Sequence, residues 1–389
     1  MNYIQQAYKG KNEWYHWLLT ILLVFIGWQA IGVIPLSLVA WKKVGNLDDF
    51  MKAAEDSFMS IGLNSNLLLF LMILMFFLGF IFLLIGVKYI HKRSITSLVT
   101  SREKIDWKRF WFGFFIWGII ASITITAGIF LAPENYVWNF NAVPFFILLA
   151  ISILFLPFQT SFEELLFRGY FMQGLGIATL NKRFPLYLII TFATILVYIF
   201  RGSFNIEGFE VFVLSAVVFL AQFFLIDDKF LNSKFNATLI IFFKTTLTPL
   251  IITSVTFGLL HGANPEVEKL GPIAMVFYIG TGFFYGITTL MDEGTELSLG
   301  LHAVNNMVAA FFVTTDWTVF QTDALYRDIS EPSVGWEMFF PVLVLYPLIL
   351  FVFSKKYGWQ NWSEKLAGKI EKPAFFTKNY DALENIGQE

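Results

Sequence analysis

Two adjacent glutamates lie in an otherwise apolar stretch of the sequence, which reads SFEELLFR from Ser161 to Arg168. A charged side chain at the centre of a membrane helix costs about 3 kcal/mol on insertion scales. Two neighbouring carboxylates also repel each other, so this stretch carries a cost that a purely structural helix avoids. Carboxylates in such a setting are typical of general bases that take a proton from water.

The spacing within this stretch separates the two carboxylates. Glu164 and Arg168 are four residues apart, which places them on one face of a helix and predicts an ion pair. Glu163 is rotated by about 100° from that face and has no predicted partner in its own helix. We therefore predict that Glu163 is the free base. The alternative is a solvated cluster of all three side chains at the cytoplasmic end of the helix.

Two of the four histidines in the chain interrupt apolar runs. His261 lies in the segment from Thr256 to Gly262, which ends an apolar run. A lone histidine at a helix end is usually a structural or interfacial residue, but histidine is so scarce in this chain that a functional role is the alternative. His302 and Asn306 lie one helical turn apart, so both can donate hydrogen bonds to one oxygen atom. Such a pair stabilises a developing oxyanion, although polar side chains also link helices in membranes.

Together the three segments supply a carboxylate base, two imidazoles and an amide donor, which are the parts needed for hydrolysis of an amide bond by water. The chain contains no cysteine, which excludes a thiol nucleophile, disulfides and cysteine-ligated metals. It also lacks the Gly-x-Ser-x-Gly motif of serine hydrolases and the His-Glu-x-x-His motif of zinc proteases.

The three motifs resemble those of the CPBP intramembrane proteases, a family also called Abi or CAAX amino-terminal proteases. In chain order, within about 145–313, they are Glu163-Glu164-x-x-x-Arg168, Phe257-x-x-x-His261 and His302-x-x-x-Asn306. The family includes the eukaryotic type II CAAX prenyl endopeptidase and bacterial proteins linked to bacteriocin processing and self-immunity. The resemblance implies an endopeptidase that acts on a peptide or protein substrate at the membrane.

The resemblance also implies a role for each motif residue. Glu163 would activate water, and the two other polar residues of its motif would hold that motif in shape: Glu164 and Arg168. His261 would help to position the water, and the oxyanion site would consist of His302 and Asn306. The neighbouring Asn305 lacks the family spacing.

A metal is a second possibility at the same residues. Members of the family are described both as metalloproteases and as glutamate-dependent proteases without a metal. Glu163, His261 and His302 could ligate a divalent metal such as zinc and leave one position open. The sequence does not choose between a metal and none.

The composition indicates which elements must position these residues. The chain of 389 residues is 57% hydrophobic and 14% charged, with a mean hydropathy of +0.64, whereas soluble domains carry about 25% charged residues. We predict an all-α, polytopic transmembrane helix bundle with about 8–10 spans, integral to the lipid bilayer. The net charge is −2, so nothing indicates binding to nucleic acid.

Ten segments are candidate spans, because each is close to the 20 or so apolar residues that a bilayer requires. They are 14–40, 67–90, 110–131, 144–166, 185–200, 211–226, 237–260, 272–291, 297–313 and 339–353. The predicted organisation is N-terminal helices (1–143), a protease core with the three motifs (144–315), and a last helix with a polar cytoplasmic tail (316–389). An extra helical hairpin at about 185–243 separates the first two motifs.

Basic residues favour the cytoplasmic side of a membrane, and they cluster after the second, fourth, sixth and last predicted helices. With ten spans, this pattern places both termini in the cytoplasm, and we expect a multi-pass protein of a bacterial plasma membrane. The same count places Glu163 toward the inner end of its helix and His261 near the outer end of another. A shared site therefore requires shifted boundaries or tilted or broken helices.

Two other functions fit part of the pattern. A non-catalytic binding or bacteriocin self-immunity protein on the same fold would not need Glu163 as a base. A transporter could use buried carboxylates to relay protons, but it predicts an internal repeat, and the sequence shows none. The complete set of motifs favours the endopeptidase.

Overall fold

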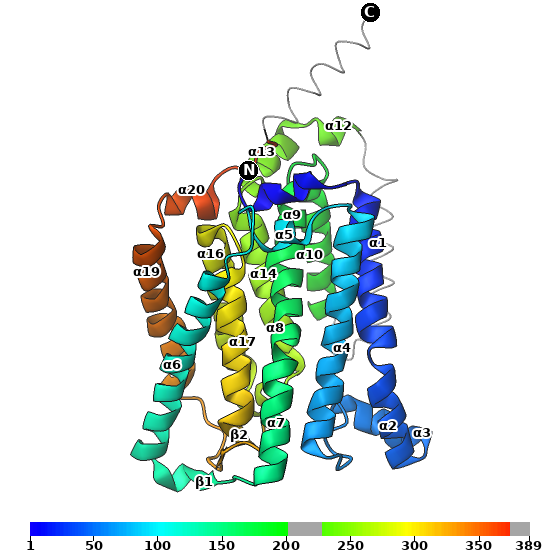
Figure 1. Cartoon of the computed structure of the whole chain (residues 1–389). Helices are drawn as coiled ribbons and strands as arrows, with labels where there is room; N and C mark the ends of the chain where they lie inside the picture. The colour runs from blue at the N-terminus through cyan, green and yellow to red at the C-terminus, as the bar shows by residue number, and fades with distance from the viewer. Residues whose placement is uncertain (201–227, 374–389) are drawn as a thin grey trace, which may run out of the picture.

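Long apolar helices account for most of the chain in the computed structural model, which describes residues 1–200 and 228–373. Within these residues, six helical segments are long and apolar enough to cross a membrane: Trp14–Val44, Ser65–Ile90, Trp107–Leu131, Ala142–Ala178, Pro272–Asp292 and Met338–Tyr357. Helices suit a bilayer because each satisfies its backbone hydrogen bonds within one segment. The predicted class, an all-α polytopic bundle, is confirmed (Figure 1).

The N-terminal half contains the first four of these segments and their connections. Its elements are η1 (Ile4–Lys9), α1 (Trp14–Phe25), η2 (Ile26–Ile31), α2 (Ile34–Val44), α3 (Leu47–Glu55), α4 (Ser65–Ile85), η3 (Gly86–Ile90), α5 (Ile95–Val99), α6 (Trp107–Leu131), η4 (Pro133–Asn135), β1 (Tyr136–Trp138), α7 (Ala142–Leu154), α8 (Leu156–Glu164), η5 (Leu165–Phe171), α9 (Met172–Ala178) and α10 (Phe184–Phe200). The segments η2, η3 and η5 are π-helical and continue the α-helices around them.

The C-terminal half supplies the helices that pack against the first motif. Its described elements are α12 (Asp228–Leu231), α13 (Lys234–Phe243), α14 (Leu247–Leu259), η6 (Leu260–Ala263), α15 (Pro265–Leu270), η7 (Pro272–Ala274), α16 (Met275–Asp292), α17 (Glu296–Phe311), β2 (Val313–Thr315), β3 (Tyr326–Asp328), α18 (Trp336–Phe340), η8 (Pro341–Leu345), α19 (Tyr346–Tyr357) and α20 (Trp362–Ala367).

Three predicted spans are not among the six long apolar segments, and a fourth cannot be compared. The segment 185–200 forms α10, a helix of 17 residues, and the segment 211–226 lies outside the described residues. The segment 237–260 is broken between residues 243 and 247 into α13 and α14. The segment 297–313 becomes α17, whose 16 residues are mostly buried, so α17 is a core helix instead of a lipid-facing span.

Helix α17 lies in the middle of the bundle, where it contacts α6, α7, α8 and α16 (Figure 1). Its contact with α6 depends on glycine. A Cβ atom at Gly113 would lie 2.6 Å from the backbone oxygen of Leu297, and one at Gly300 would collide with the backbone oxygen of Phe110. Small residues let helix backbones approach closely in membranes. The polar residues of α17 are thereby held close to α6 and α8.

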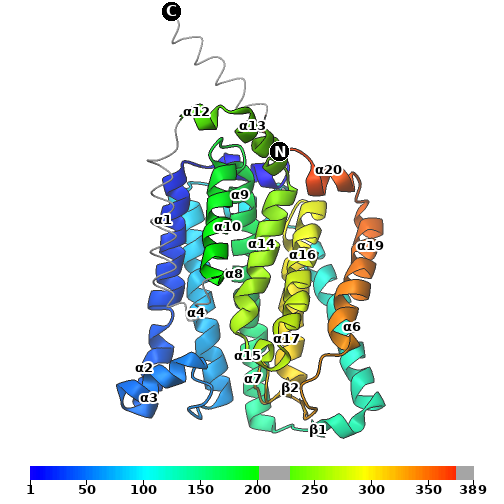
Figure 2. The same ribbon diagram turned by 180° about the vertical axis from the view of Figure 1, so that it is seen from behind.

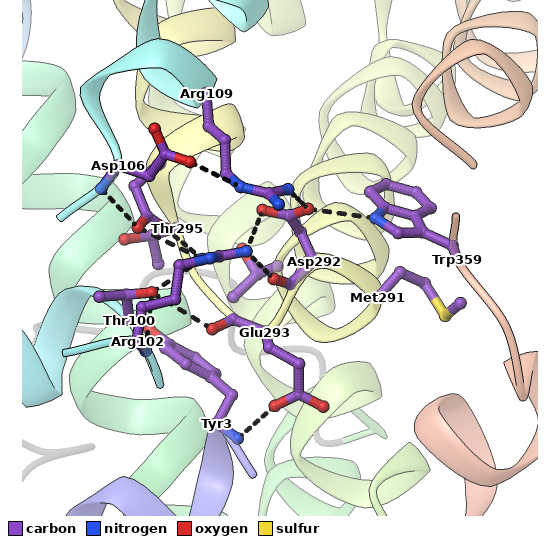
Figure 3. A network of polar contacts seen from close by, with 12 residues as sticks. Tyr3, Thr100, Arg102, Asp106, Arg109, Met291, Asp292, Glu293, Thr295 and Trp359 are labelled. Atoms are coloured by element: carbon purple, nitrogen blue, oxygen red, sulfur yellow. Dashed lines mark hydrogen bonds and ion pairs between the residues drawn. The ribbon is translucent and has the colours of Figure 1, made fainter. Parts of the chain in front are cut away.

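A network of charged side chains holds the loop between α16 and α17 (Figure 3). Asp292 accepts hydrogen bonds from Arg102, from Arg109 and from the indole of Trp359. Arg102 also pairs with Glu296 at the start of α17, with 3.1 Å between Nη1 and Oε2. Because these carboxylates lie almost fully buried against their arginines, the network fixes the start of the helix that carries His302.

The two ends of the bundle differ. Segment η1 and helices α5, α13 and α20 lie at one end, whereas β1 and β2 lie at the other (Figures 1 and 2). The strands form a sheet in the order β1-β3-β2, in which β3 pairs antiparallel with β1 and parallel with β2. The N-terminus and the last described helix therefore share one end of the bundle.

Candidate active site

The glutamates of the first motif lie near the middle of the long helical segment Ala142–Ala178. The predicted end of this span at residue 166 is wrong, because η5 and α9 continue it. Helix α8 ends at Glu164, and the seven residues that follow are π-helical. π-helical turns inside α-helices are frequent at functional sites. Glu163 therefore lies well inside the bundle and not near a helix end.

The short length of α14 accounts for the depth of His261. Helix α14 begins near the end of the bundle that carries the N-terminus (Figure 2). Its 13 residues span about 20 Å, whereas the hydrocarbon core of a bilayer is about 30 Å thick. His261, in the turn after α14, is therefore short of the far surface. The predicted conflict in depth between His261 and Glu163 arises from wrong helix boundaries.

Glu164 and Arg168 form the predicted ion pair. Arg168 Nη1 lies 3.1 Å from Glu164 Oε1, and both side chains are 0% exposed. Arg168 Nη2 donates to the backbone oxygen of Gly282 at 3.2 Å, and the guanidinium lies 4.0 Å from the ring centre of Phe257. The alternative of a solvated cluster is wrong, because burial leaves the pair no access to water. Arg168 instead ties α16 and α14 to the first motif.

His302 lies between the two glutamates. Its Nδ1 is 2.9 Å from Glu164 Oε1, and its Nε2 is 3.6 Å from Glu163 Oε2. The ring stacks on Tyr285, with 5.1 Å between the ring centres and 28° between the planes. Tyr285 is on α16, so stacking fixes the plane of the imidazole while Glu164 fixes its rotation.

Glu163 has a partner in its own helix, contrary to the prediction. Gln159, one turn earlier, donates from Nε2 to Glu163 Oε1 at 2.6 Å. The other carboxylate oxygen, Oε2, is buried and has no hydrogen-bond partner within residues 1–200 and 228–373. Gln159 belongs to none of the three motifs. It is nevertheless a polar residue four positions before Glu163 in an apolar run, a spacing that predicts contact between two side chains on one helix face.

Asn306 joins the same cluster through Gln159. Its Nδ2 donates to Gln159 Oε1 at 3.0 Å, while Asn305 donates to Asn306 Oδ1 at 3.1 Å. The side chains of Glu163, His302 and Asn306 are thus brought together from α8 and α17. Asn305 also belongs to the arrangement, because its amide holds that of Asn306.

His261 lies beside this cluster without bonding to it. Its Nδ1 is 2.8 Å from the backbone oxygen of Phe257, and its ring stacks on Tyr278 at 4.6 Å and 18°. In the described part of the chain it makes no hydrogen bond or ion pair with Glu163, Glu164 or His302. The Phe257 ring lies 4.8 Å from the His261 ring and 6.0 Å from the His302 ring. The Phe257 ring is therefore a common neighbour of the two imidazoles.

The three residues that could ligate zinc are not brought together as one set. Glu163 and His302 approach each other, but His261 packs with Tyr278. Among the residues that the structure describes, no three His, Cys, Asp or Glu side chains are arranged to hold a metal ion. A catalytic zinc takes three protein ligands, so this set does not fit the observed arrangement.

Comparison with known proteins supports the resemblance in the motifs. Residues 141–308 match the family described as Type II CAAX prenyl endopeptidase Rce1-like, and this segment contains all three motifs. The match confirms the predicted relation to the CPBP and CAAX proteases. The chain is 26% identical over 261 residues to the uncharacterized protein YyaK of Bacillus subtilis (strain 168). The aligned region covers 67% of this chain and 66% of that relative. No solved structure matches the chain.

Proposed function

We propose that the chain is an intramembrane endopeptidase of the CAAX protease type, in which Glu163 activates the water that cleaves a peptide bond. The observation that carries this proposal is the position of one carboxylate oxygen. Glu163 Oε2 is buried, has no hydrogen-bond partner among the described residues, and lies 3.6 Å from His302 Nε2, within ion-pair distance. At a separation above 3.5 Å, two polar groups can share one water molecule, and we propose that the reactive water takes this place when substrate is bound. That water would be held by an acceptor on one side and an imidazole on the other.

The proposed reaction is a general-base hydrolysis. Glu163 takes one proton from the water as the water oxygen bonds to the carbonyl carbon of the substrate. The carbonyl oxygen becomes the oxyanion of a tetrahedral intermediate. When the C–N bond breaks, the proton held by Glu163 passes to the leaving amine, which restores the carboxylate.

The contacts of His302 decide when it can stabilise the oxyanion. Its Nδ1 faces the carboxylate of Glu164 at 2.9 Å, so the neutral ring carries its proton on Nδ1 and presents Nε2 as an acceptor. His302 therefore donates from Nε2 only after it has gained a second proton. Asn306 uses one N–H of its amide for Gln159, and its second N–H can donate to the oxyanion in either state of His302.

The location of the site supports a substrate at the membrane. Glu163 lies in the middle of a span, and its side chain is 13% exposed, so a peptide segment must enter the bundle to reach it. The N-terminus and α20 share one end of the bundle (Figure 1), and the positive-inside rule would place that end in the cytoplasm. We propose a bacterial plasma membrane as the setting.

The central experiment is cleavage by the purified protein in liposomes, with a fluorogenic peptide library or labelled membrane proteins as substrates. Glu163→Gln should lower kcat by about 10²–10⁴, the range of a lost general base. The exposed Glu134, replaced by glutamine, is the matched control and should retain full activity. Full activity in Glu163→Ala would reject the mechanism. If cells that express Glu163→Gln remained protected against a bacteriocin, the result would favour a non-catalytic self-immunity protein.

Metal dependence is tested separately, by metal analysis of the purified protein and by cleavage in the presence of a chelator. The arrangement around Glu163 and His302 predicts activity in the chelator. Loss of activity that returns on adding zinc would contradict this expectation and show that the enzyme depends on a metal.

A further inference from the structure

Four hydrogen bonds link the indole of Trp117 to the carboxylate of Glu163 through three side-chain amides. In order, the bonds are Trp117 Nε1 to Asn305 Oδ1 (3.0 Å), Asn305 Nδ2 to Asn306 Oδ1 (3.1 Å), Asn306 Nδ2 to Gln159 Oε1 (3.0 Å), and Gln159 Nε2 to Glu163 Oε1 (2.6 Å). The chain of bonds begins on α6, crosses α17 and ends on α8. We call it the amide relay.

The chemistry of the two ends gives the relay a single direction. The indole N–H of Trp117 can only donate, so it selects the oxygen of Asn305 as its partner. The ionised carboxylate of Glu163 can only accept, so it selects the nitrogen of Gln159. Turning any one of the three amides around would place two oxygens or two N–H groups face to face. The orientations of all three amides are therefore determined together, although each amide alone is ambiguous.

The relay decides which atoms of the site remain available. Gln159 occupies Glu163 Oε1, so only Oε2 faces the gap to His302. The same orientation turns the nitrogen of Asn306 toward the site and its oxygen toward Asn305. Hydrogen-bond chains in a low-dielectric interior strengthen one another, so a group at one end can influence a group at the other.

We propose that Trp117 is a positioning residue for the catalytic carboxylate and that it acts through the amide relay; this inference rests on the proposed function. Trp117 is 8% exposed, and in the described part of the chain it makes no hydrogen bond with Glu163 or His302. It also lies outside the segment 141–308 that matches the protease family. A helix that the family match does not include thus contributes to the geometry of the site.

The simplest alternative is that these amides only join helices, as polar side chains do in many membrane bundles. In that case their loss would lower stability and leave the turnover of the folded protein unchanged. The two cases differ in kcat, which a purely structural role does not change once the folded fraction is taken into account.

The test compares Trp117→Phe with Trp28→Phe. Trp28 packs against Phe76 and Phe162 near the site, and its buried Nε1 has no partner among the described residues. Both variants lose an indole whose Nε1 is inside the bundle, although Trp117 is buried and Trp28 is half-buried; only Trp117→Phe loses a donor to the relay. We expect Trp117→Phe to lower kcat roughly ten- to a hundredfold with little change in KM, and Trp28→Phe to retain the kcat of the wild type.

A double variant shows whether the effect passes through the relay. If Trp117 acts only by way of Gln159, adding Trp117→Phe to Gln159→Leu should lower kcat no further, whereas independent effects multiply. The isosteric Asn305→Asp keeps the volume and the acceptor for Trp117, but it places an oxygen against Asn306. It should lower kcat as Trp117→Phe does, even if the tryptophan variant folds poorly.

The outcomes separate this inference from the proposed function. Wild-type protein that cleaves no substrate in any assay refutes the proposed function itself. An active wild type with an inactive Glu163→Gln, together with normal kcat in both Trp117→Phe and Asn305→Asp, overturns the relay alone. Equal losses in Trp117→Phe and Trp28→Phe, or multiplied losses in the double variant, also overturn it.

Discussion

The buried ion pair of the first motif should contribute far more to stability than an exposed pair in the same protein. Glu164 and Arg168 are both 0% exposed and lie 3.1 Å apart. Removal of one partner of such a pair leaves a charge buried without compensation, which typically costs about 3–5 kcal/mol. We expect Arg168→Leu to lower the free energy of unfolding by about 4 kcal/mol, a large part of the total for most domains.

A second substitution tests whether the cost comes from the unpaired charge. In the double variant Arg168→Leu with Glu164→Gln no charge remains, and the amide oxygen introduced at residue 164 can still accept from His302. The double variant should therefore be less destabilised than the sum of the two single variants, by about 2 kcal/mol. The non-additivity measures the coupling between the two contacting side chains, and we expect the buried ion pair to supply most of it.

The assay is reversible unfolding in mixed micelles, followed by tryptophan fluorescence as the denaturing detergent fraction rises. The control is the exposed pair of Arg327 and Asp316, whose side chains are 45% and 71% exposed and lie 3.6 Å apart. Arg327→Leu should cost less than about 1 kcal/mol. The reasoning is refuted if Arg168→Leu costs no more than Arg327→Leu, or if the cycle of Arg168 and Glu164 variants is additive.

Three further predictions concern other parts of the chain. Burial lowers the pKa of His91 to about 4 from an ordinary value of 6.5, so the folded state loses stability as the pH falls from 6.5 to 4. Because His91 is fully buried, thermal melts should show a loss of about 3 kcal/mol over this range, and His91→Gln should remove it. Gly300→Ala would drive a Cβ into the backbone oxygen of Phe110 and should lower stability by about 3 kcal/mol in the same micelle assay, whereas unchanged stability would contradict the close packing. Tyr278→Leu should lower kcat about tenfold because His261 loses its stacking partner. Tyr278→Phe keeps the ring and should retain more activity than Tyr278→Leu. If the two variants lost the same activity, the hydroxyl group of Tyr278 would matter instead of its ring.

Helix periodicity and hydropathy predict the class of fold because both are local properties. The runs that begin at residues 14, 67 and 110 become the first three spans with ends that shift by a few residues. The C-terminal boundary at residue 166 is wrong because Arg168 is polar in the sequence but neutralised by Glu164 in the structure. A count of charges cannot detect that compensation, so it ends the helix too early.

The candidate site is predicted in part. Glu163, Glu164 and Arg168 lie within two successive turns of one segment, so their relation follows from helix geometry, as does the shared face of His302 and Asn306. The contact of His302 with Glu164 joins residues 138 positions apart, and Asn306 reaches Gln159 across 147 positions. No local pattern encodes contacts of this kind.

The sequence by itself determined that this is a bundle of membrane helices with carboxylate, imidazole and amide groups in three family motifs. Only the tertiary structure decided which of those groups contact one another and which lie apart. It placed His302 between the two glutamates, set His261 apart against Tyr278, and brought Gln159 and Trp117 into the site through hydrogen bonds. The reason is physical: residue types and spacing act along one helix, whereas the direction of a hydrogen bond between helices depends on how closely those helices pack.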